Sequence, residues 1–416
     1  MQEEAMLTRR FVGLSLAAAA AMAGRTTSAQ TPMTVAEQYQ AEGRYLPFYL
    51  NLRARADAGE EEARYVLPWF AAFVGDEATA IGFDERPRPA GTPLPDLAGA
   101  EVSDALETIV QAAADKQIVV LNEAHNVSGH RSFAARVMRA LRPLGFDTFA
   151  AETFGGMGGY RAGIPFHSRF GYYTADPVFA EMVREAASLG YAFADYEQTA
   201  DQRLPADADM DAQTTAREVA QSANLIHNVL KPRPAARIFV LCGYSHATEM
   251  AGVGGLWFAG QLKAATGIDP LTIEQSSNWP ATRPEADTPE TAAVLERFAP
   301  TRPLSVWRDG RAFGNRFFDG KVDLSVFHPR LPKVAGRPGW LAADPARKAV
   351  EVSVPAFEGP ALMQALHMDE GAVVPADHLL LEKGQEKATL LLRPGSYFLR
   401  LETVRGIEPA CGTMTV

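Results

Sequence analysis

Short apolar runs alternate with longer amphipathic stretches from about residue 104 to residue 275. Runs of this length are typical of buried strands, and the stretches between them repeat apolar residues at the helical period. Strands are predicted at 117–121, 148–152, 191–195, 237–242 and 270–274, and helices at 132–144, 177–189 and 214–230. Alternating strands and helices are typical of βα units. The sequence therefore predicts an α/β domain with a mainly parallel sheet flanked by helices.

The pattern of apolar and polar residues differs on both sides of this region. Residues 34–75 have helical periodicity with a charged face, and a proline-rich stretch follows at 86–95. After about residue 300, short alternating runs at 349–354, 388–392 and 397–403 predict a small antiparallel β-domain, with a hairpin turn at 393–396. The predicted organisation is an export signal at 1–29, a helical lead-in and linker at 30–100, the α/β domain at 101–300, a connecting segment at 301–340 and a β-rich domain at 341–416.

The first residues are typical of an export signal. Arg9 and Arg10 precede an apolar run at 11–24, and small residues up to Ala29 provide a cleavage site. The arginine pair favours the twin-arginine route, with the general secretory route as the alternative, and translation starts at either Met1 or Met6. The apolar run is about fourteen residues long, whereas a spanning helix needs roughly twenty. We therefore expect a periplasmic or secreted protein without a stable membrane span.

Composition and charge narrow the classes of partner. Apolar residues make up 47% of the chain, which is enough for a sizeable core, and the formal net charge is −10. Basic residues after the N-terminus do not gather into a stripe that would neutralise phosphates, so nucleic acid is not an expected partner. The two cysteines are Cys242 and Cys411. They either form a bridge, which export permits, or Cys242 stays a buried thiol within its apolar run.

Polar residues follow three of the predicted strands. Glu123 and His125 follow the strand 117–121, Glu152 ends the strand 148–152, and His246 follows the strand 237–242. Because ligands gather at the carboxyl ends of strands in open α/β sheets, we expect these side chains at one site. Glu123 and His125 are two residues apart, so in extended chain they point to the same face. The carboxylate there either orients the imidazole and raises its basicity, or joins it in holding a metal.

Further candidates lie on the adjoining helices and loops. His130 lies near the start of the helix that follows the first strand and can turn its ring back toward the strand ends. Arg217 lies on the helix predicted at 214–230, on a face that must pack on the sheet. A buried arginine needs an anionic partner, and the carboxylates of the site are expected to supply it. The loop residues His167, Tyr172 and Tyr173 predict a partly apolar pocket.

Four segments, in order, resemble one group of protein families. Residues 120–126 (Val-Leu-Asn-Glu-Ala-His-Asn), followed by His130, are similar to the G-E-x-H-(D/N)-x-x-x-H opening of the ChaN-like haem-uptake proteins, with Asn122 in place of the glycine. Residues 146–152 resemble the next strand of these proteins, which ends in a glutamate, and residues 217–224 resemble their R-(D/E)-x-x-(M/V)-A-x-N helix. Residues 243–246 (Gly-Tyr-Ser-His) match the closing G-x-x-H. The chain thus resembles the erythromycin esterase, ChaN-like and TraB-like (Tiki-related) superfamily, and its motif spacing is closest to the ChaN-like proteins.

This resemblance implies a site built from two glutamates and two or three histidines. The esterases of the group use such a site for hydrolysis by a histidine-activated water, and the Tiki-like proteases use a divalent metal. Other members bind haem or iron without a known reaction.

Our first hypothesis is a hydrolase of an ester, lactone or amide, with a small molecule or a peptide as substrate. His125 and His246 would activate water directly, or through a divalent metal that they hold together with Glu123 and Glu152. Arg217 or His130 would stabilise the developing oxyanion. The sequence has no G-x-S-x-G elbow and no H-E-x-x-H helix, which disfavours a serine nucleophile and a zincin mechanism.

The alternative is a binding protein of the ChaN type. The same residues would then hold haem or a metal without catalysis, and Tyr172, Tyr173 or His167 would supply an axial ligand. A third hypothesis is an adhesion or scaffolding module whose C-terminal β-domain binds a partner.

Overall fold

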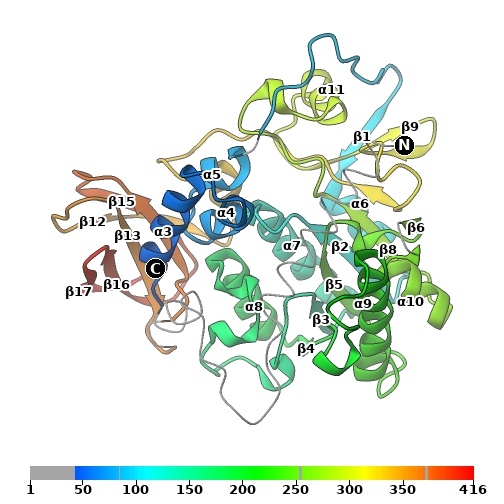
Figure 1. Cartoon of the computed structure of the whole chain (residues 1–416), viewed down its shortest axis with the longest axis horizontal. Helices are drawn as coiled ribbons and strands as arrows, with labels where there is room; N and C mark the ends of the chain where they lie inside the picture. Colours follow the sequence, from blue (N-terminus) through cyan, green and yellow to red (C-terminus); the bar gives the residue numbers. More distant parts are fainter. Residues whose placement is uncertain (1–42, 84, 253–254, 371–372) are drawn as a thin grey trace.

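A computed structural model describes residues 43–83, 85–252, 255–370 and 373–416 of the chain (Figure 1). The predicted export signal at 1–29 and the beginning of the predicted lead-in lie outside these residues. Within the described ranges, no helix has both the length and the apolar character that crossing a membrane requires.

The centre of the molecule is a parallel sheet, and it confirms the predicted α/β fold. Among the described residues its strands run in the order β11–β8–β2–β5–β3–β4, and each neighbouring pair is parallel. All of the strands predicted between residues 117 and 274 belong to it. The two residues of β11 come from the predicted connecting segment and were not expected. The strands are β2 (Ile118–Glu123), β3 (Thr148–Ala151), β4 (Ala192–Ala194), β5 (Ile238–Gly243), β8 (Leu271–Glu274) and β11 (Leu324–Ser325).

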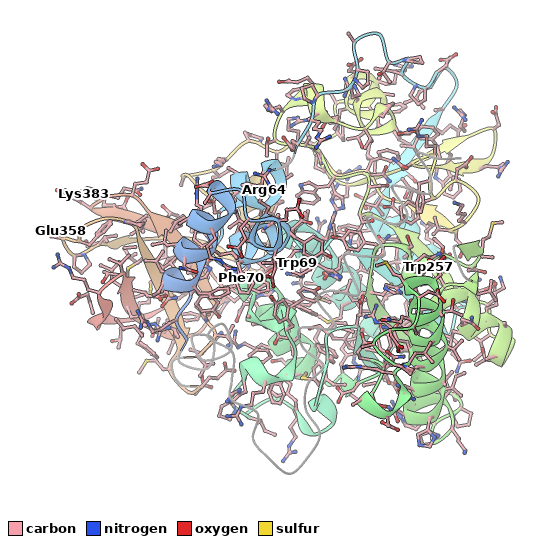
Figure 2. All side chains as sticks on the ribbon, viewed as in Figure 1. Arg64, Trp69, Phe70, Trp257, Glu358 and Lys383 are labelled. Atoms are coloured by element: carbon pink, nitrogen blue, oxygen red, sulfur yellow. The ribbon has the colours of Figure 1, made fainter. Side chains whose placement is uncertain are left out.

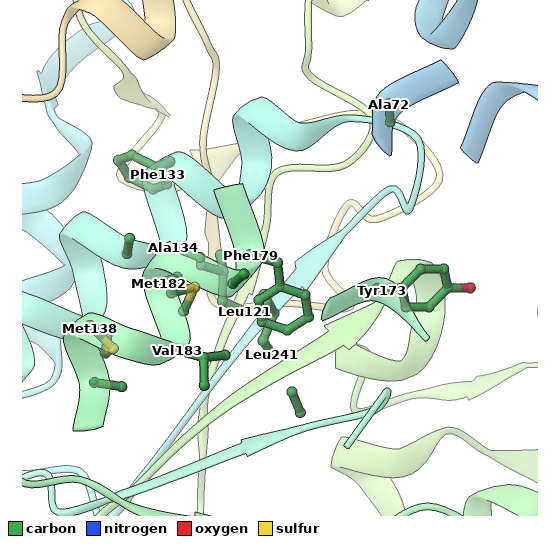
Figure 3. Close-up of a cluster of buried hydrophobic side chains, with 14 of the residues drawn as sticks. Ala72, Leu121, Phe133, Ala134, Met138, Tyr173, Phe179, Met182, Val183 and Leu241 are labelled. Atoms are coloured by element: carbon green, nitrogen blue, oxygen red, sulfur yellow. The ribbon is translucent and has the colours of Figure 1, made fainter. Parts of the chain in front are cut away.

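Helices cover both faces of this sheet. Every residue of β2 and β5 is buried, as expected for parallel strands with helices on both sides. On one face, Val119 and Leu121 pack against α7 (Ser128–Leu141) and α8 (Pro177–Ser188), and Figure 3 shows the side chains of this cluster. On the other face, Val120 and Val240 pack against α9 (Met210–Leu225), the π-helical turn Ile226–Leu230 and α10 (Phe258–Thr266). Cys242 belongs to the second cluster as a free, buried thiol.

Further helices and a small sheet come from the segments before and after the central sheet. The helices of the lead-in lie between the C-terminal β-domain and α7 (Figure 1). A small antiparallel sheet joins β1 to β9 and β10, so residues 101–104 pair with residues 304–307. The elements are α3 (Leu46–Asp57), α4 (Glu61–Phe73), α5 (Glu77–Gly82), β1 (Glu101–Asp104), α6 (Ala105–Ala112), β6 (Ala251–Gly252), β7 (Gly255–Leu256), α11 (Pro289–Phe298), β9 (Leu304–Arg308), β10 (Arg311–Phe313) and α12 (Gly339–Ala342).

The C-terminal region forms two antiparallel sheets, as predicted. One joins β12 (Lys348–Ser353) to β15 (Lys387–Leu392), and the other has the order β14–β13–β16–β17. The strands of the second sheet are β13 (Ala361–His367), β14 (Asp377–Leu381), β16 (Ser396–Thr403) and β17 (Gly406–Thr415).

The hairpin turn predicted at 393–396 is wrong. This turn joins β15 to β16, which belong to different sheets, so the chain crosses between sheets there instead of reversing within one. The Tyr397 hydroxyl fixes the corner by donating to the Arg393 carbonyl over 2.9 Å. Apolar residues of both sheets, such as Leu390 and Leu401, share one core, and this packing requires the crossing.

Candidate active site

Three neighbouring strands bring the predicted glutamates and histidines together. Their order in the sheet is β3–β5–β2, so the carboxyl ends that carry Glu152, His246 and the Glu123–His125 pair are adjacent. At most 7% of any of these four residues is exposed. They converge over Gly243, where an added Cβ would lie 2.7 Å from His125 Nε2 and 2.9 Å from Glu152 Oε2. The site is therefore a closely packed group of buried charges.

His125 is oriented by Glu123. Its Nδ1 lies 3.1 Å from Glu123 Oε1, and Arg131 donates to the same carboxylate from Nε and Nη2, each over 2.9 Å. Burial raises the pKa of Glu123, but Arg131 and His125 outweigh it and bring the pKa from 4.5 down to about 2. Ionised Glu123 can only accept, so Nδ1 of His125 carries the hydrogen. In the neutral ring, Nε2 then has a free lone pair.

The surroundings of His125 leave this lone pair unused. The ring stacks on Tyr173, with the centroids 4.2 Å apart and the planes at 18°, and Trp69 and Tyr244 meet it edge-on. Nε2 is buried and has no hydrogen-bond partner among the described residues. A buried polar atom without a partner is costly, which indicates a place for a reacting molecule.

His246 is paired in a similar way, but its second nitrogen is occupied. Nδ1 lies 2.8 Å from the Glu218 carboxylate, and Nε2 lies 3.1 Å from Nη1 of Arg217. Arginine only donates, so Nε2 of His246 accepts in this arrangement. Burial lowers the pKa of His246, but the carboxylates of Glu218 and Glu152 outweigh it, and the pKa is raised. Both ring nitrogens of His246 are therefore engaged, one by a carboxylate and one by an arginine.

Arg217 links the two halves of the site. Its Nη2 donates to Glu152 Oε1 over 2.6 Å, and its Nε donates to Glu197 Oε1 over 3.0 Å. The other oxygen of Glu152 accepts from the Gly243 amide over 2.6 Å. Burial raises the pKa of Glu152, but Arg217 and the two histidines outweigh it, and the pKa is lowered. The prediction that a buried Arg217 pairs with a carboxylate of the site agrees with these contacts.

The backbone after β5 is held in a strained conformation. Tyr244 has φ = +40°, a left-handed value that a non-glycine residue rarely adopts. Asn122 supports it, because its Nδ2 donates to the Tyr244 carbonyl over 2.8 Å while its Oδ1 accepts from the Gln275 amide over 2.8 Å. Asn122 thus joins the ends of β2, β5 and β8.

The structure places His130 outside this group. Its Nδ1 accepts from the Ala124 amide over 3.1 Å, and its ring meets Trp279 edge-on with centroids 5.0 Å apart. Burial lowers the pKa of His130 to about 3, so the ring is neutral. His130 shapes the turn after β2, and its hydrogen bond and its ring contact go to Ala124 and Trp279, although the charge of Glu123 still acts on its pKa.

Of the three predicted loop residues, one lies in the site and two lie elsewhere. Tyr173 lies in the site, stacked on His125. Tyr172 packs against Phe70 and Phe73, and His167 accepts from the Arg169 amide at the start of a short helix. Neither of these two residues contacts the four residues of the site.

Sequence reasoning missed Arg131 and did not assign a role to Glu218. Arg131 is fully buried on α7, among mostly apolar side chains, and it also donates to Asp176 Oδ2 over 2.7 Å. A charged residue at such a position signals a buried ion pair. Glu218 follows Arg217 directly in the segment that resembles a family motif, which was the available signal for its role.

The side chains proposed as metal ligands do not fit a preformed metal site. Both carboxylates are engaged by arginines, and a cation would have to displace these guanidinium groups. Among the described residues, no group of three or more His, Cys, Asp or Glu side chains is arranged to hold a metal ion.

Comparison with known proteins gives no family. No family profile and no curated protein matches the chain. Solved structures with partial similarity include a bacterial protein toxin, at 14% identity and a TM-score of 0.30, covering 39% of this chain and 35% of that one. A MARTX toxin effector domain from Vibrio vulnificus aligns at 15% identity and a TM-score of 0.33, covering 58% and 54%. The C-terminal region of Pasteurella multocida toxin, described with a thiol-protease-like catalytic triad, aligns at 13% and 0.29, covering 52% and 29%.

The chain thus spans about a third of the length of the first of these proteins.

Proposed function

We propose that this protein is an exported hydrolase of an ester, lactone or amide, and that its Glu/His site activates water without a metal. The observation that carries the proposal is the lone pair of His125 Nε2. It is buried, oriented through Nδ1 by an ionised carboxylate, and without a partner among the described residues. The resemblance to the erythromycin esterases, which use a histidine-activated water, supports the same chemistry. The signal predicted at 1–29 supports export to the periplasm.

The geometry supports a general-base mechanism. A water bound at His125 Nε2 would attack the carbonyl carbon of the substrate while its proton passes to Nε2. The imidazolium formed in this step is stabilised by Glu123 at Nδ1 and by the charge of Glu152. When the tetrahedral intermediate collapses, the same proton returns to the leaving oxygen or nitrogen, which balances the reaction.

Arg217 is the group best placed to stabilise the oxyanion. It is buried between Glu152 and His246, where a positive charge acts strongly because water is excluded. Glu218 and Glu152 hold His246 beside it, so His246 positions Arg217. His130 has no part in this step, because its ring lies in another cluster.

Haem binding has less support. Tyr173 covers the face of His125, Tyr172 is packed among phenylalanine rings, and His167 caps a short helix. Of these three proposed axial ligands, only Tyr173 lies beside a site histidine, and it does so stacked on the ring of His125.

The test is hydrolysis of ester, lactone and amide libraries by the purified protein, with chelator present and absent. We expect chelator-independent turnover that falls by about 10²–10⁴-fold in His125→Ala, since general-base catalysis contributes that much. His227→Ala, which removes an exposed histidine, is the matched control and should keep full activity. Stoichiometric metal in the wild type that disappears in the His125→Ala/His246→Ala variant would overturn the metal-free mechanism. Full activity in His125→Ala would overturn the assignment of the base.

A further inference from the structure

A large cavity adjoins the candidate site. Its volume is about 970 Å³, which is at the upper end of the range for small-molecule sites. It lies beyond the carboxyl ends of β2, β5 and β8, where Ala124, Tyr244 and Ser276 form part of its wall. The catalytic groups lie beyond β3, β5 and β2, so the cavity and the site share the ends of two strands.

Tyr244 and Trp69 border both spaces. Each lines the cavity, and each meets the His125 ring edge-on, with centroids 5.1 Å and 6.4 Å apart. Figure 2 shows Trp69 together with Arg64 on α4. A molecule that reaches His125 therefore has aromatic rings beside it on the cavity side.

The walls of the cavity are rich in aromatic rings drawn from distant segments. They come from α4, from the turn after β5, from the loop after β8 and from the loop before β11. The rings of Tyr65 and Trp69 meet edge-on with centroids 5.4 Å apart, and those of Phe317 and Phe318 meet edge-on with centroids 4.9 Å apart. Aromatic walls favour a flat aromatic ligand, because paired rings gain stability beyond the area that they bury. The aromatic lining residues are Tyr65, Trp69, Tyr244, Trp279, Phe317 and Phe318.

Formal charges in the lining balance. Two arginines, Arg64 and Arg316, are matched by two carboxylates, Glu85 and Glu290. Thr282 donates to Glu85, and Asn315 donates to Glu290 over 3.4 Å. A ligand with a net charge would therefore gain little from this cavity, whereas a neutral ring would gain from burial.

We propose that this cavity binds an uncharged aromatic group of the substrate while the scissile ester or amide lies at His125. Only the placement of the scissile bond at His125 rests on the proposed function. Binding of the aromatic group depends on the cavity and not on His125 as a base.

The test separates binding from turnover. Calorimetric titration would compare 2-naphthylacetamide with 2-naphthylacetate, which has the same ring and a negative charge, and with acetamide, which has no ring. We expect the neutral naphthyl amide to bind at least 10-fold more tightly than either, in wild type and in His125→Ala alike. Among esters that the wild type hydrolyses, kcat/KM should be at least 10-fold higher for naphthyl than for cyclohexyl members of matched pairs.

Two variants change the cavity in opposite ways, one by removing a ring from its wall and one by filling its space. Phe317→Ala removes a half-buried ring, and Ala281→Trp fills the space from the wall. Both should weaken binding of the naphthyl amide at least 5-fold, while Phe398→Ala, a half-buried ring of the C-terminal β-domain, leaves it unchanged. Equal binding of the three probes, or binding that neither variant weakens, overturns the proposal. Naphthyl binding without any hydrolysis would support the cavity and overturn the proposed function instead.

Discussion

At the scale of single residues, the two histidines differ in what faces Nε2. Both are oriented at Nδ1 by a buried glutamate, but Nε2 of His246 is occupied by Arg217, whereas Nε2 of His125 has no partner among the described residues. This difference assigns the base to His125. It depends on Glu123 being ionised, which Arg131 ensures from the same helix that covers the sheet.

The charge of Glu123 should therefore be visible in stability as well as in activity. Its pKa is depressed to about 2 in the folded protein, so its contribution to stability is present above about pH 4.5 and is lost as the pH falls toward 2. We expect Glu123→Gln to lower the free energy of unfolding by about 3 kcal/mol at pH 7, because Arg131 loses one of its buried partners. Urea unfolding measures this difference.

The control for Glu123→Gln is Glu107→Gln, an exposed position whose change should leave stability within about 0.5 kcal/mol. Repeating both measurements at pH 3 should shrink the difference between wild type and Glu123→Gln. A difference that stays constant between pH 7 and pH 3 would show that Glu123 is not ionised by Arg131.

At the scale of elements, the end of β5 determines how closely the site can assemble. Gly243 lets His125 and Glu152 lie against the backbone, since a Cβ there would be 2.6 Å from His125 Cε1. Real Cβ atoms do not approach other atoms so closely, and both neighbours are buried. The side chains of His125 and Glu152 therefore pack directly against the backbone at the end of β5.

Gly243→Ala should displace His125 and Glu152 without removing either. We expect hydrolytic activity to fall at least 100-fold, with a loss of about 1–3 kcal/mol in unfolding free energy from overpacking. Gly155→Ala is the matched control, because a Cβ there meets nothing within 4 Å and the backbone is not left-handed. Full activity in Gly243→Ala, measured with the same ester, would mean that the site does not need this close contact.

Local pattern was enough to predict the elements of the central sheet. The central strands β2 and β5 are buried on both faces and so appear as apolar runs, and the helices between the strands end at glycine or proline. The two residues of β11 carry no such run, because they pair only along the edge of β8. The turn at 393–396 was mistaken for a hairpin because Pro and Gly mark a reversal without saying which strands it joins.

The candidate site was predictable only in part. Strand ends indicate Glu123, His125, Glu152 and His246, since neighbouring parallel strands end at one edge. The partners that decide their ionisation come from helices, and which helical residue reaches which strand end depends on tertiary packing. His130 was predicted for the site from its sequence position, but its ring turns toward Trp279, which only tertiary packing determines.

At the scale of the whole molecule, the C-terminal β-domain is tied to the lead-in helices. Glu402 on β16 is fully buried and accepts from the amides of Tyr45 and Leu46, where α3 begins, over 3.0–3.1 Å. A carboxylate at a helix N-terminus satisfies amides that have no partner within the helix. A second tie runs from Glu181 on α8 to His367 on β13 over 2.8 Å. The C-terminal β-domain is thus bonded both to the start of α3 and to α8.

These ties predict that the C-terminal β-domain and the α/β core unfold together. Glu402→Gln should lower the free energy of unfolding by about 2 kcal/mol, because the new amide keeps only one of the two oxygens that accept from Tyr45, Leu46 and Gln364. Glu408→Gln, an exposed neighbour across the hairpin, should change it little. Thermal unfolding followed by circular dichroism and by residual hydrolysis should give one transition at the same temperature with both probes, lower in Glu402→Gln. Two separated transitions, with activity surviving the first, would instead make the C-terminal β-domain an independent unit that the site does not require.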